Sequence, residues 1–224
     1  MMMNRARATG WGLLALVFWS TTIAVSRSLE EQVGAMRAGA AMYFGGAVLA
    51  FALSAARGEK GPALRALPRR YLLVCGGLFA LYAVSLYLAI GFAVDRHQVQ
   101  EVTVLNYLWP GLTLALSIPI LRHRPRPLFA VGLLTAFAGV AVVVFRGEWQ
   151  TMGAVWSRLC DRPGPYVGGL IAGVSWALFS NLTRKWAGGR PGQAAPWFFL
   201  VTAAVLAGLS VWRGETSQLS GRVL

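Results

Sequence analysis

The chain has 224 residues, of which 56% are apolar and only 13% are charged, whereas soluble domains carry about 25% charged residues. This composition argues against a soluble globular fold. The net charge of +13 would suggest nucleic-acid binding in a soluble protein, but the 21 Lys and Arg residues gather mostly in short clusters between long apolar runs. We therefore predict a polytopic protein of the lipid bilayer, with no nucleic-acid partner.

Seven apolar segments follow one another along the chain, each close to the length of about 20 residues that crosses a bilayer. They cover residues 11–28, 34–56, 71–94, 99–121, 128–145, 166–183 and 194–212. The predicted fold class is thus all-α, with about seven transmembrane helices.

The distribution of cations favours one orientation of these segments. The N-terminal tail and the loops after the second, fourth and sixth segments hold 13 of the 21 Lys and Arg residues. By the positive-inside rule this places the N-terminus in the cytoplasm. The start of the chain also resembles a cleavable signal peptide, because Arg5 and Arg7 precede an apolar run that ends in Ala24-Val25-Ser26. The repeat described below favours an uncleaved first span.

Residues that commonly carry chemistry are sparse. Cys75 and Cys160 form no CxxC pair, and His97 and His123 lie in different loops without partners at ligand spacing. The sequence has no paired-carboxylate motif, no HExxH and no GxSxG. We therefore expect no enzyme, no metal site and no cofactor.

An internal repeat relates the beginning of the chain to its end. A shift of 157 residues aligns Gly-Leu-Leu-Ala-Leu-Val-Phe-Trp at 12–19 with Gly-Leu-Ile-Ala-Gly-Val-Ser-Trp at 169–176, and Arg27 with Arg184. Small and aliphatic residues align readily in any two membrane helices, but the shared Trp and Arg favour a true repeat. Because the sixth segment matches the first, each unit holds five helices, and an odd number inverts the second unit in the membrane. We assign residues 1–150 to the first five-helix unit and 151–224 to an incomplete second one, with seven of ten expected helices.

The fourth segment carries the densest polar signal. Asn106, Trp109, Pro110, Thr113 and Ser117 are spaced by three and four residues and so form one stripe along a helix. At membrane depth such a polar stripe must face protein or water. Pro110 has no N–H to donate to the carbonyl of Asn106, so we expect a kink and a freed carbonyl that could accept a substrate ammonium. The alternative is an ordinary proline kink with Asn106 bonded to a neighbouring helix.

Several aromatic residues lie near the middle of their segments. Trp19, Trp109 and Trp176 do so, and at that depth an indole N–H needs a protein partner or a polar cavity; packing against another helix explains each equally well. Tyr82 adds a further mid-depth ring. No Asp, Glu, Lys, Arg or His lies in the middle of any segment, which argues against proton antiporters of the small multidrug type and carriers of phosphorylated sugars. These residues indicate an aromatic, largely uncharged cavity.

The block Asn106-Tyr107-Leu108-Trp109-Pro110, the pair Trp19-Ser20 and the five-helix repeat resemble the EamA-type drug/metabolite transporter superfamily, most closely its bacterial aromatic amino acid exporters. The resemblance implies a ten-helix inner-membrane exporter that works by alternating access through a central cavity. By that likeness the residues that line the cavity are Trp19, Tyr82, Tyr107, Trp109 and Trp176. Together with Asn106 from the polar stripe, they are the candidate substrate-binding residues, and Pro110 is the predicted helix kink.

We therefore expect a multi-pass protein of the cell inner membrane that exports amino acids, aromatic ones foremost, and whose substrate is a small amphipathic molecule. Two alternatives stay open: broad drug or metabolite efflux by the same scaffold, and a truncated membrane protein that does not transport. Since the second unit ends at Leu224, after the counterpart of the second segment, a second chain could complete the missing helices.

Overall fold

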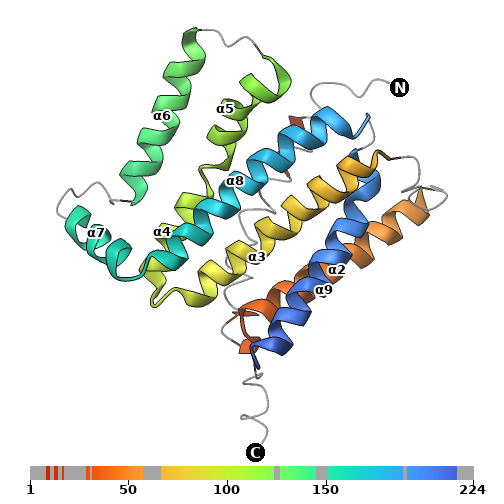
Figure 1. The fold of residues 1–224 in the computed structure, drawn as a ribbon, viewed down its shortest axis with the longest axis horizontal. Helices are drawn as coiled ribbons and strands as arrows, with labels where there is room; N and C mark the ends of the chain where they lie inside the picture. The colour runs from red at the N-terminus through yellow and green to blue at the C-terminus, as the bar shows by residue number, and fades with distance from the viewer. Residues whose placement is uncertain are drawn as a thin grey trace, which may run out of the picture.

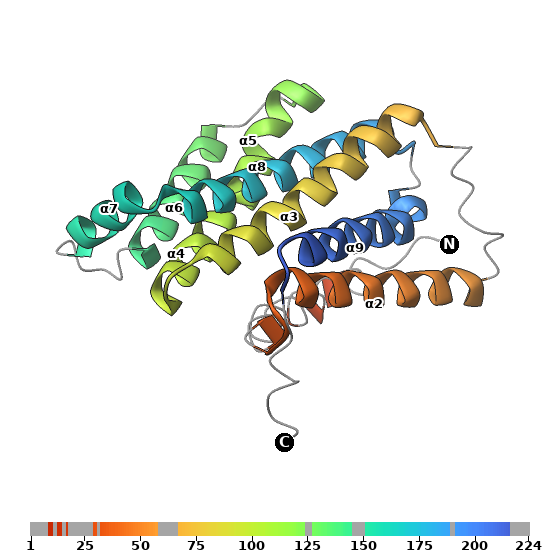
Figure 2. The ribbon, with the colours of Figure 1, turned by 60° about the horizontal axis from the view of Figure 1, so that its bottom comes forward.

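The computed structural model describes residues 9–10, 13–14, 17, 29–30, 32–57, 67–123, 127–144, 151–188 and 191–215. The named elements in these ranges are all helices: α2 (Ala35–Ala56), η2 (Tyr71–Cys75), α3 (Gly76–Phe92), α4 (Arg96–Asn106), α5 (Trp109–Leu121), α6 (Pro127–Val144), α7 (Thr151–Asp161), α8 (Pro163–Trp186), η3 (Pro191–Ala194) and α9 (Ala195–Trp212). α3 and α8 lie side by side in the middle, α2 and α9 pack on one side, and α6 and α7 lie on the other (Figures 1 and 2). The predicted all-helical fold is confirmed for this part of the chain.

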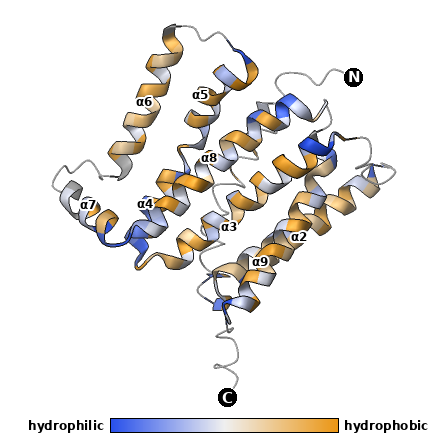
Figure 3. Ribbon diagram, in the orientation of Figure 1, coloured by the Kyte–Doolittle hydropathy of each residue, from blue (hydrophilic) through white to orange (hydrophobic). Residues whose placement is uncertain are grey.

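The surface of these helices is that of a membrane protein. Four described helical stretches are long and apolar enough to cross a bilayer, Ala35–Ala56, Tyr71–Phe92, Arg96–Leu121 and Gly192–Trp212, and the apolar part of α6 is shorter. Figure 3 shows hydrophobic residues over most of α2, α3, α6 and α9, and hydrophilic residues near helix ends and at the α3–α4 turn. Large apolar side chains such as Leu73 and Leu128, 76% and 79% exposed, face outward. Such apolar faces are stable in contact with lipid tails and not with water. The chain is therefore a polytopic membrane protein.

The predicted segments after the first correspond to the observed helices, while the first one falls mostly outside the described residues. The fourth segment is divided, because α4 and α5 are separated at residues 107–108. α4 also begins earlier than predicted, at Arg96, since Asp95 caps it: the Asp95 carboxylate accepts from the Gln98 N–H at 2.7 Å, and the Gln98 side chain accepts from the Val94 N–H at 3.0 Å. This reciprocal cap starts a helix on polar residues that hydropathy leaves out.

The loop expected between the fifth and sixth segments contains a helix, α7, so that expectation is wrong. α7 is short and amphipathic. Because one of its faces is polar, a search for long apolar runs does not detect it. Its Arg158 forms an ion pair with Glu101 on α4, and the Tyr166 hydroxyl of α8 donates to the same carboxylate. The hydrogen bond that Arg158 donates to the Glu101 carboxylate raises the pKa of the Arg158 guanidinium. Because Glu101 is buried, this cluster ties α4, α7 and α8 together.

α8 packs closely on its neighbours through glycines. A Cβ at Gly168 would lie 3.0 Å from the backbone oxygen of Ser85 on α3, and one at Gly169 would lie 3.0 Å from that of Val102 on α4. One turn further, a Cβ at Gly173 would lie 3.2 Å from the backbone oxygen of Asn106. Small residues at such spacing let membrane helices approach each other closely. α8 is thereby held against both α3 and α4, which carry much of the site described below.

α2 and α9 form an antiparallel pair, with the start of one beside the end of the other. Glu215, just after α9, accepts hydrogen bonds from the backbone N–H groups of Met36 and Arg37 at 3.2 and 3.1 Å. Gly34 precedes α2 with φ +90°, and a Cβ there would lie 2.7 Å from the Glu215 carboxylate, so only glycine fits this turn. The predicted repeat makes these two segments counterparts, and antiparallel packing is the orientation that inversion requires of them.

Candidate functional site

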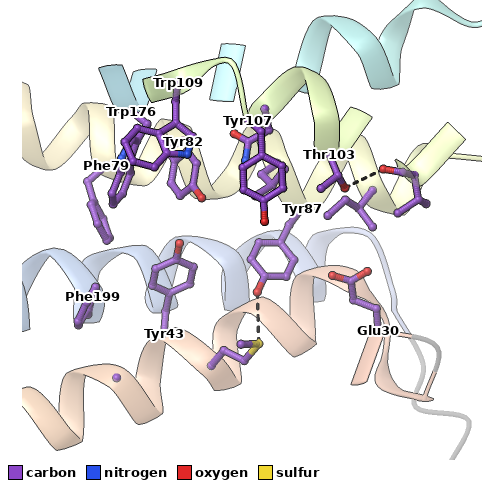
Figure 4. A pocket seen from close by; sticks show the side chains of 16 residues that line it. Glu30, Tyr43, Phe79, Tyr82, Tyr87, Thr103, Tyr107, Trp109, Trp176 and Phe199 are labelled. Carbon is purple, nitrogen blue, oxygen red and sulfur yellow. Dashed lines mark hydrogen bonds between the residues drawn. The ribbon is translucent and has the colours of Figure 1, made fainter. Parts of the chain in front are cut away.

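A cavity of about 410 Å³ opens inside the bundle. Its walls come from α2, α3, α4, α8, α9, the start of α5 and the residues before α2 (Figure 4). Most of the large lining side chains are aromatic: Tyr43, Phe79, Tyr82, Tyr87, Tyr107, Trp109, Trp176 and Phe199. The polar side chains among the other lining residues are Glu30, Thr103 and Asn106. The cavity is thus an aromatic chamber with few polar groups.

The structure brings most of the predicted site residues together. Tyr82, Asn106, Tyr107, Trp109 and Trp176 all line this one cavity, although they lie on α3, α4, the α4–α5 break, α5 and α8. Trp19 lies outside the described residues. These side chains therefore meet in space from segments that are far apart in sequence.

The break between α4 and α5 sets the direction of two of these rings. The Tyr107 N–H still makes an α-helical bond, to the Thr103 carbonyl at 3.0 Å, but the Leu108 N–H donates to the Leu105 carbonyl, three residues back, at 3.1 Å. A new helix then starts at Trp109. Pro110 lies in the first turn of α5, where the missing N–H costs nothing. The interruption turns Tyr107 and Trp109 toward the same cavity (Figure 4).

The two polar groups of Asn106 have different surroundings. Its backbone oxygen, expected from the sequence as an acceptor for substrate, lies against Gly173 of α8. Its side chain is buried and lines the cavity, and the amide Oδ1 has no hydrogen-bond partner within the described part of the chain. The side chain rather than the backbone carbonyl is therefore the acceptor available at this position.

The last two residues of the predicted polar stripe, Thr113 and Ser117, do not line this cavity. Thr113 and Ser117 line a second hollow between α5, α6 and α8. Their hydroxyls donate to the carbonyl oxygens of Trp109 and Leu114 in their own helix, both at 2.7 Å, as Ser and Thr often do in helices. Asn181 of α8 donates to the Thr113 carbonyl at 2.9 Å, so this stripe joins α5 to α8.

The aromatic rings form a continuous cluster centred on Trp176. The Trp176 ring centroid lies 4.7 Å from that of Tyr82, 5.9 Å from that of Phe79 and 6.1 Å from that of Trp109, the last pair being edge to face. Phe79 in turn contacts Tyr43 and the α9 ring Phe199. Offset and edge-to-face pairs of this kind fix ring orientation, so one end of the cavity is a preformed aromatic wall.

The other end of the cavity holds a carboxylate that sequence reasoning missed. Glu30 is 8% exposed and lines the cavity, and its backbone oxygen accepts from the Gly34 N–H at 3.0 Å just before α2. Figure 4 shows Glu30 and Thr103 at the end away from Trp109 and Trp176. In the sequence Glu30 falls between two apolar segments, which reads as a loop at the membrane surface; only the packing of the bundle brings it to the cavity.

The described residues contain no cluster of three His, Cys, Asp or Glu that could hold a metal ion. The groups that line the cavity are aromatic rings, hydroxyls, one amide and one carboxylate. Such a lining binds and orients a small amphipathic molecule.

Comparison with known proteins agrees with this interpretation. Residues 7–145 match the EamA-like transporter family. The chain belongs to this family. It is 33% identical over 205 residues to proteins named aromatic amino acid exporter YddG from Salmonella typhimurium and Escherichia coli, which covers 91% of this chain and 67% of theirs.

Two further proteins are similar to this chain. A protein of the same name from Ancylobacter novellus is 29% identical over 209 residues, covering 92% of this chain and 67% of that protein. A solved crystal structure superposes with a TM-score of 0.69 at 25% identity, over 93% of this chain and 68% of the other. The resemblance inferred from the Asn-Tyr-Leu-Trp-Pro block is thus confirmed at the level of the EamA-like family.

Proposed function

We propose that this chain exports aromatic amino acids across the inner membrane by alternating access to the cavity described above. The observation that carries the proposal is the cavity itself, about 410 Å³ in volume, lined mainly by aromatic rings and, among the described lining residues, by one charged side chain. Cavities of this size and lining suit a small molecule with an apolar body and a polar head. The names of the relatives support the same substrate class.

In this proposal each predicted residue has a physical task. Trp109 and Trp176 present an edge-to-face pair against which a substrate ring packs. Tyr82 and Tyr107 border the same space, and the Asn106 amide offers a hydrogen bond within it. The break before Pro110 keeps Tyr107 and Trp109 turned inward. Trp19, the repeat counterpart of Trp176, is proposed as a further wall of the cavity.

The proposed orientation has a cytoplasmic N-terminus, because 13 of the 21 cations lie in the tail and loops of that side. The helices then belong to two inverted units, residues 1–150 and 151–224. The antiparallel contact of α2 with α9 supports this division, as does the shared Gly-to-Trp block at 12–19 and 169–176.

Efflux of labelled phenylalanine tests the proposal, with Trp109→Ala compared against Trp156→Ala. Trp109 lines the cavity, whereas Trp156 is 66% exposed on α7, so the pair removes the same ring from inside and outside the site. Loss of the ring contact is expected to slow efflux about tenfold, which corresponds to about 1.4 kcal/mol. Trp156→Ala should leave efflux unchanged. A folded Trp109→Ala protein that exports phenylalanine at the full rate would remove the assignment.

Wider efflux of amphipathic drugs is the second candidate function. The observation in its favour is that apolar rings dominate the cavity lining, with few groups to specify one ligand. A cationic dye in excess should then compete with phenylalanine for export. If only aromatic amino acids compete, the narrower function holds.

A further inference from the structure

The second hollow, between α5, α6 and α8, has a volume of about 650 Å³. Its described lining shares no residue with the aromatic cavity. The proposed export function therefore makes no use of it, and its chemistry calls for a separate explanation.

One part of this hollow is apolar and open to the side of the bundle. Leu114 and Ile118 of α5 and Leu128 and Phe129 of α6 line it. Leu114 and Leu128 are exposed, so this part of the hollow faces the surroundings of the helices. In a bilayer those surroundings are lipid tails.

The other part of the hollow is cationic and lies at helix ends. Arg184 is in the last turn of α8, and His123 comes just after α5. These two helix ends lie on the same side of the bundle, where Figure 3 shows hydrophilic residues (Figures 1 and 3). Thr113 lines the hollow about two turns before the end of α5. The hollow thus extends from the level of the helix ends into the apolar layer.

The neutral donors in the hollow already have acceptors within the protein. The hydroxyls of Thr113, Ser117 and Ser180 each donate to a carbonyl oxygen of their own helix at 2.7–2.8 Å. The Asn181 amide donates to two carbonyl oxygens at 2.9 and 3.0 Å. None of the described lining residues is acidic. The donors in this lining that suit an anion are therefore the guanidinium of Arg184 and the imidazole of His123.

A cation beside an apolar groove matches the two parts of a phospholipid. A guanidinium donates two parallel hydrogen bonds to phosphate oxygens, and an acyl chain fits against exposed leucine and phenylalanine side chains. Basic pockets between transmembrane helices on the cytoplasmic side bind anionic lipid head groups. Arg184 and His123 follow the sixth and fourth predicted segments, on the side that the cation distribution places in the cytoplasm.

We propose that this hollow binds an anionic phospholipid of the cytoplasmic leaflet. The lipid phosphate lies at Arg184 and His123, and one acyl chain lies along Leu114, Leu128 and Phe129. This lipid site is separate from the aromatic cavity, so it stands or falls independently of the proposed export function.

The test is a lipid titration of the purified chain in detergent, followed by native mass spectrometry, which counts bound lipids for each protein. Phosphatidylglycerol should bind at least about fivefold more tightly than phosphatidylcholine, whose choline offsets the phosphate charge. Glycerol 3-phosphate, which has the phosphate without acyl chains, should bind at least about tenfold more weakly than phosphatidylglycerol. These comparisons use the unmodified protein, so they hold even if a substitution prevents folding.

Variants then assign the binding to this hollow. Arg184→Gln should weaken phosphatidylglycerol binding at least about tenfold, and His123→Ala, on the other side of the hollow, at least about threefold. Lys185→Gln is the matched control, because it removes the same charge from an exposed neighbouring residue that does not line the hollow. It should change binding less than twofold.

Three results would overturn the proposal. Equal affinity for phosphatidylglycerol and phosphatidylcholine would remove the selection for an anion. Equal losses in Arg184→Gln and Lys185→Gln would show attraction by overall charge and not a site. Glycerol 3-phosphate binding as tightly as phosphatidylglycerol would identify a site for a free phosphate compound and not for a lipid.

Discussion

The Glu101 cluster offers a stability test whose size follows from the structure. Arg158→Met removes the guanidinium from a buried carboxylate that Tyr166 also contacts. With the Arg158 Nε 3.4 Å from Glu101 Oε2, two unit charges attract by about 5 kcal/mol at an effective dielectric constant of about 20. The side chain of Arg158 is 35% exposed, so hydration offsets part of this. We expect a net loss of about 2–3 kcal/mol in the free energy of unfolding.

The assay is thermal unfolding in detergent, followed by tryptophan fluorescence for Arg158→Met, Glu101→Gln and the double variant. A loss of this size lowers the melting temperature by about 4–12 °C in a chain of this length. The double variant should lose less than the sum of the single ones, with a coupling of about 1.5–3 kcal/mol. Arg162→Met, at an exposed neighbouring arginine, should change stability by less than about 0.5 kcal/mol. Additive single losses would refute the ion pair as a support of the fold.

Three other predictions concern packing, capping and exposure. Gly169→Ala places a Cβ 3.0 Å from a backbone oxygen of α4 and should lower stability by about 1–3 kcal/mol, whereas Gly132→Ala, with open space around it, should not; melting temperatures decide. Glu215→Ala removes two hydrogen bonds from the first turn of α2. It should lower the free energy of unfolding, measured by chemical denaturation, by about 1 kcal/mol. Cys160 is exposed and Cys75 is buried, so a membrane-impermeant maleimide should label only Cys160, and from the periplasmic side if the N-terminus is cytoplasmic. Labelling of Cys160 only in inverted vesicles would contradict that orientation.

The sequence predicted the helices well where they are apolar and poorly where they are not. The segment at 71–94 became η2 and α3 with little change, because a long apolar run has few other folds in a bilayer. α7 was not visible in this way, since its burial is one-sided and depends on Arg158 meeting Glu101 on another helix. The start of α4 likewise depended on the cap between Asp95 and Gln98. Hydropathy does not detect either contact.

Some residues of the candidate site could be recognised from the sequence and others could not. Trp109 and Trp176 were recognisable because aromatic residues at mid-depth are uncommon enough to need an explanation. Glu30 was not recognisable, because its place in the sequence suggests a surface loop. The sequence also does not show that Gly173 of α8 lies against the Asn106 carbonyl.

The sequence by itself determined that this chain is an all-helical membrane protein of the EamA-like family and which aromatic residues to examine, because hydropathy and local motifs are read directly along the chain. Only the tertiary structure decided that rings from α3, α5 and α8 meet in one cavity and that a carboxylate closes its far end. The physical reason is that such a meeting depends on how each helix is rotated and how closely it packs. Those quantities are set by contacts such as Gly169 on Val102 and Gly173 on Asn106, which join residues distant in sequence.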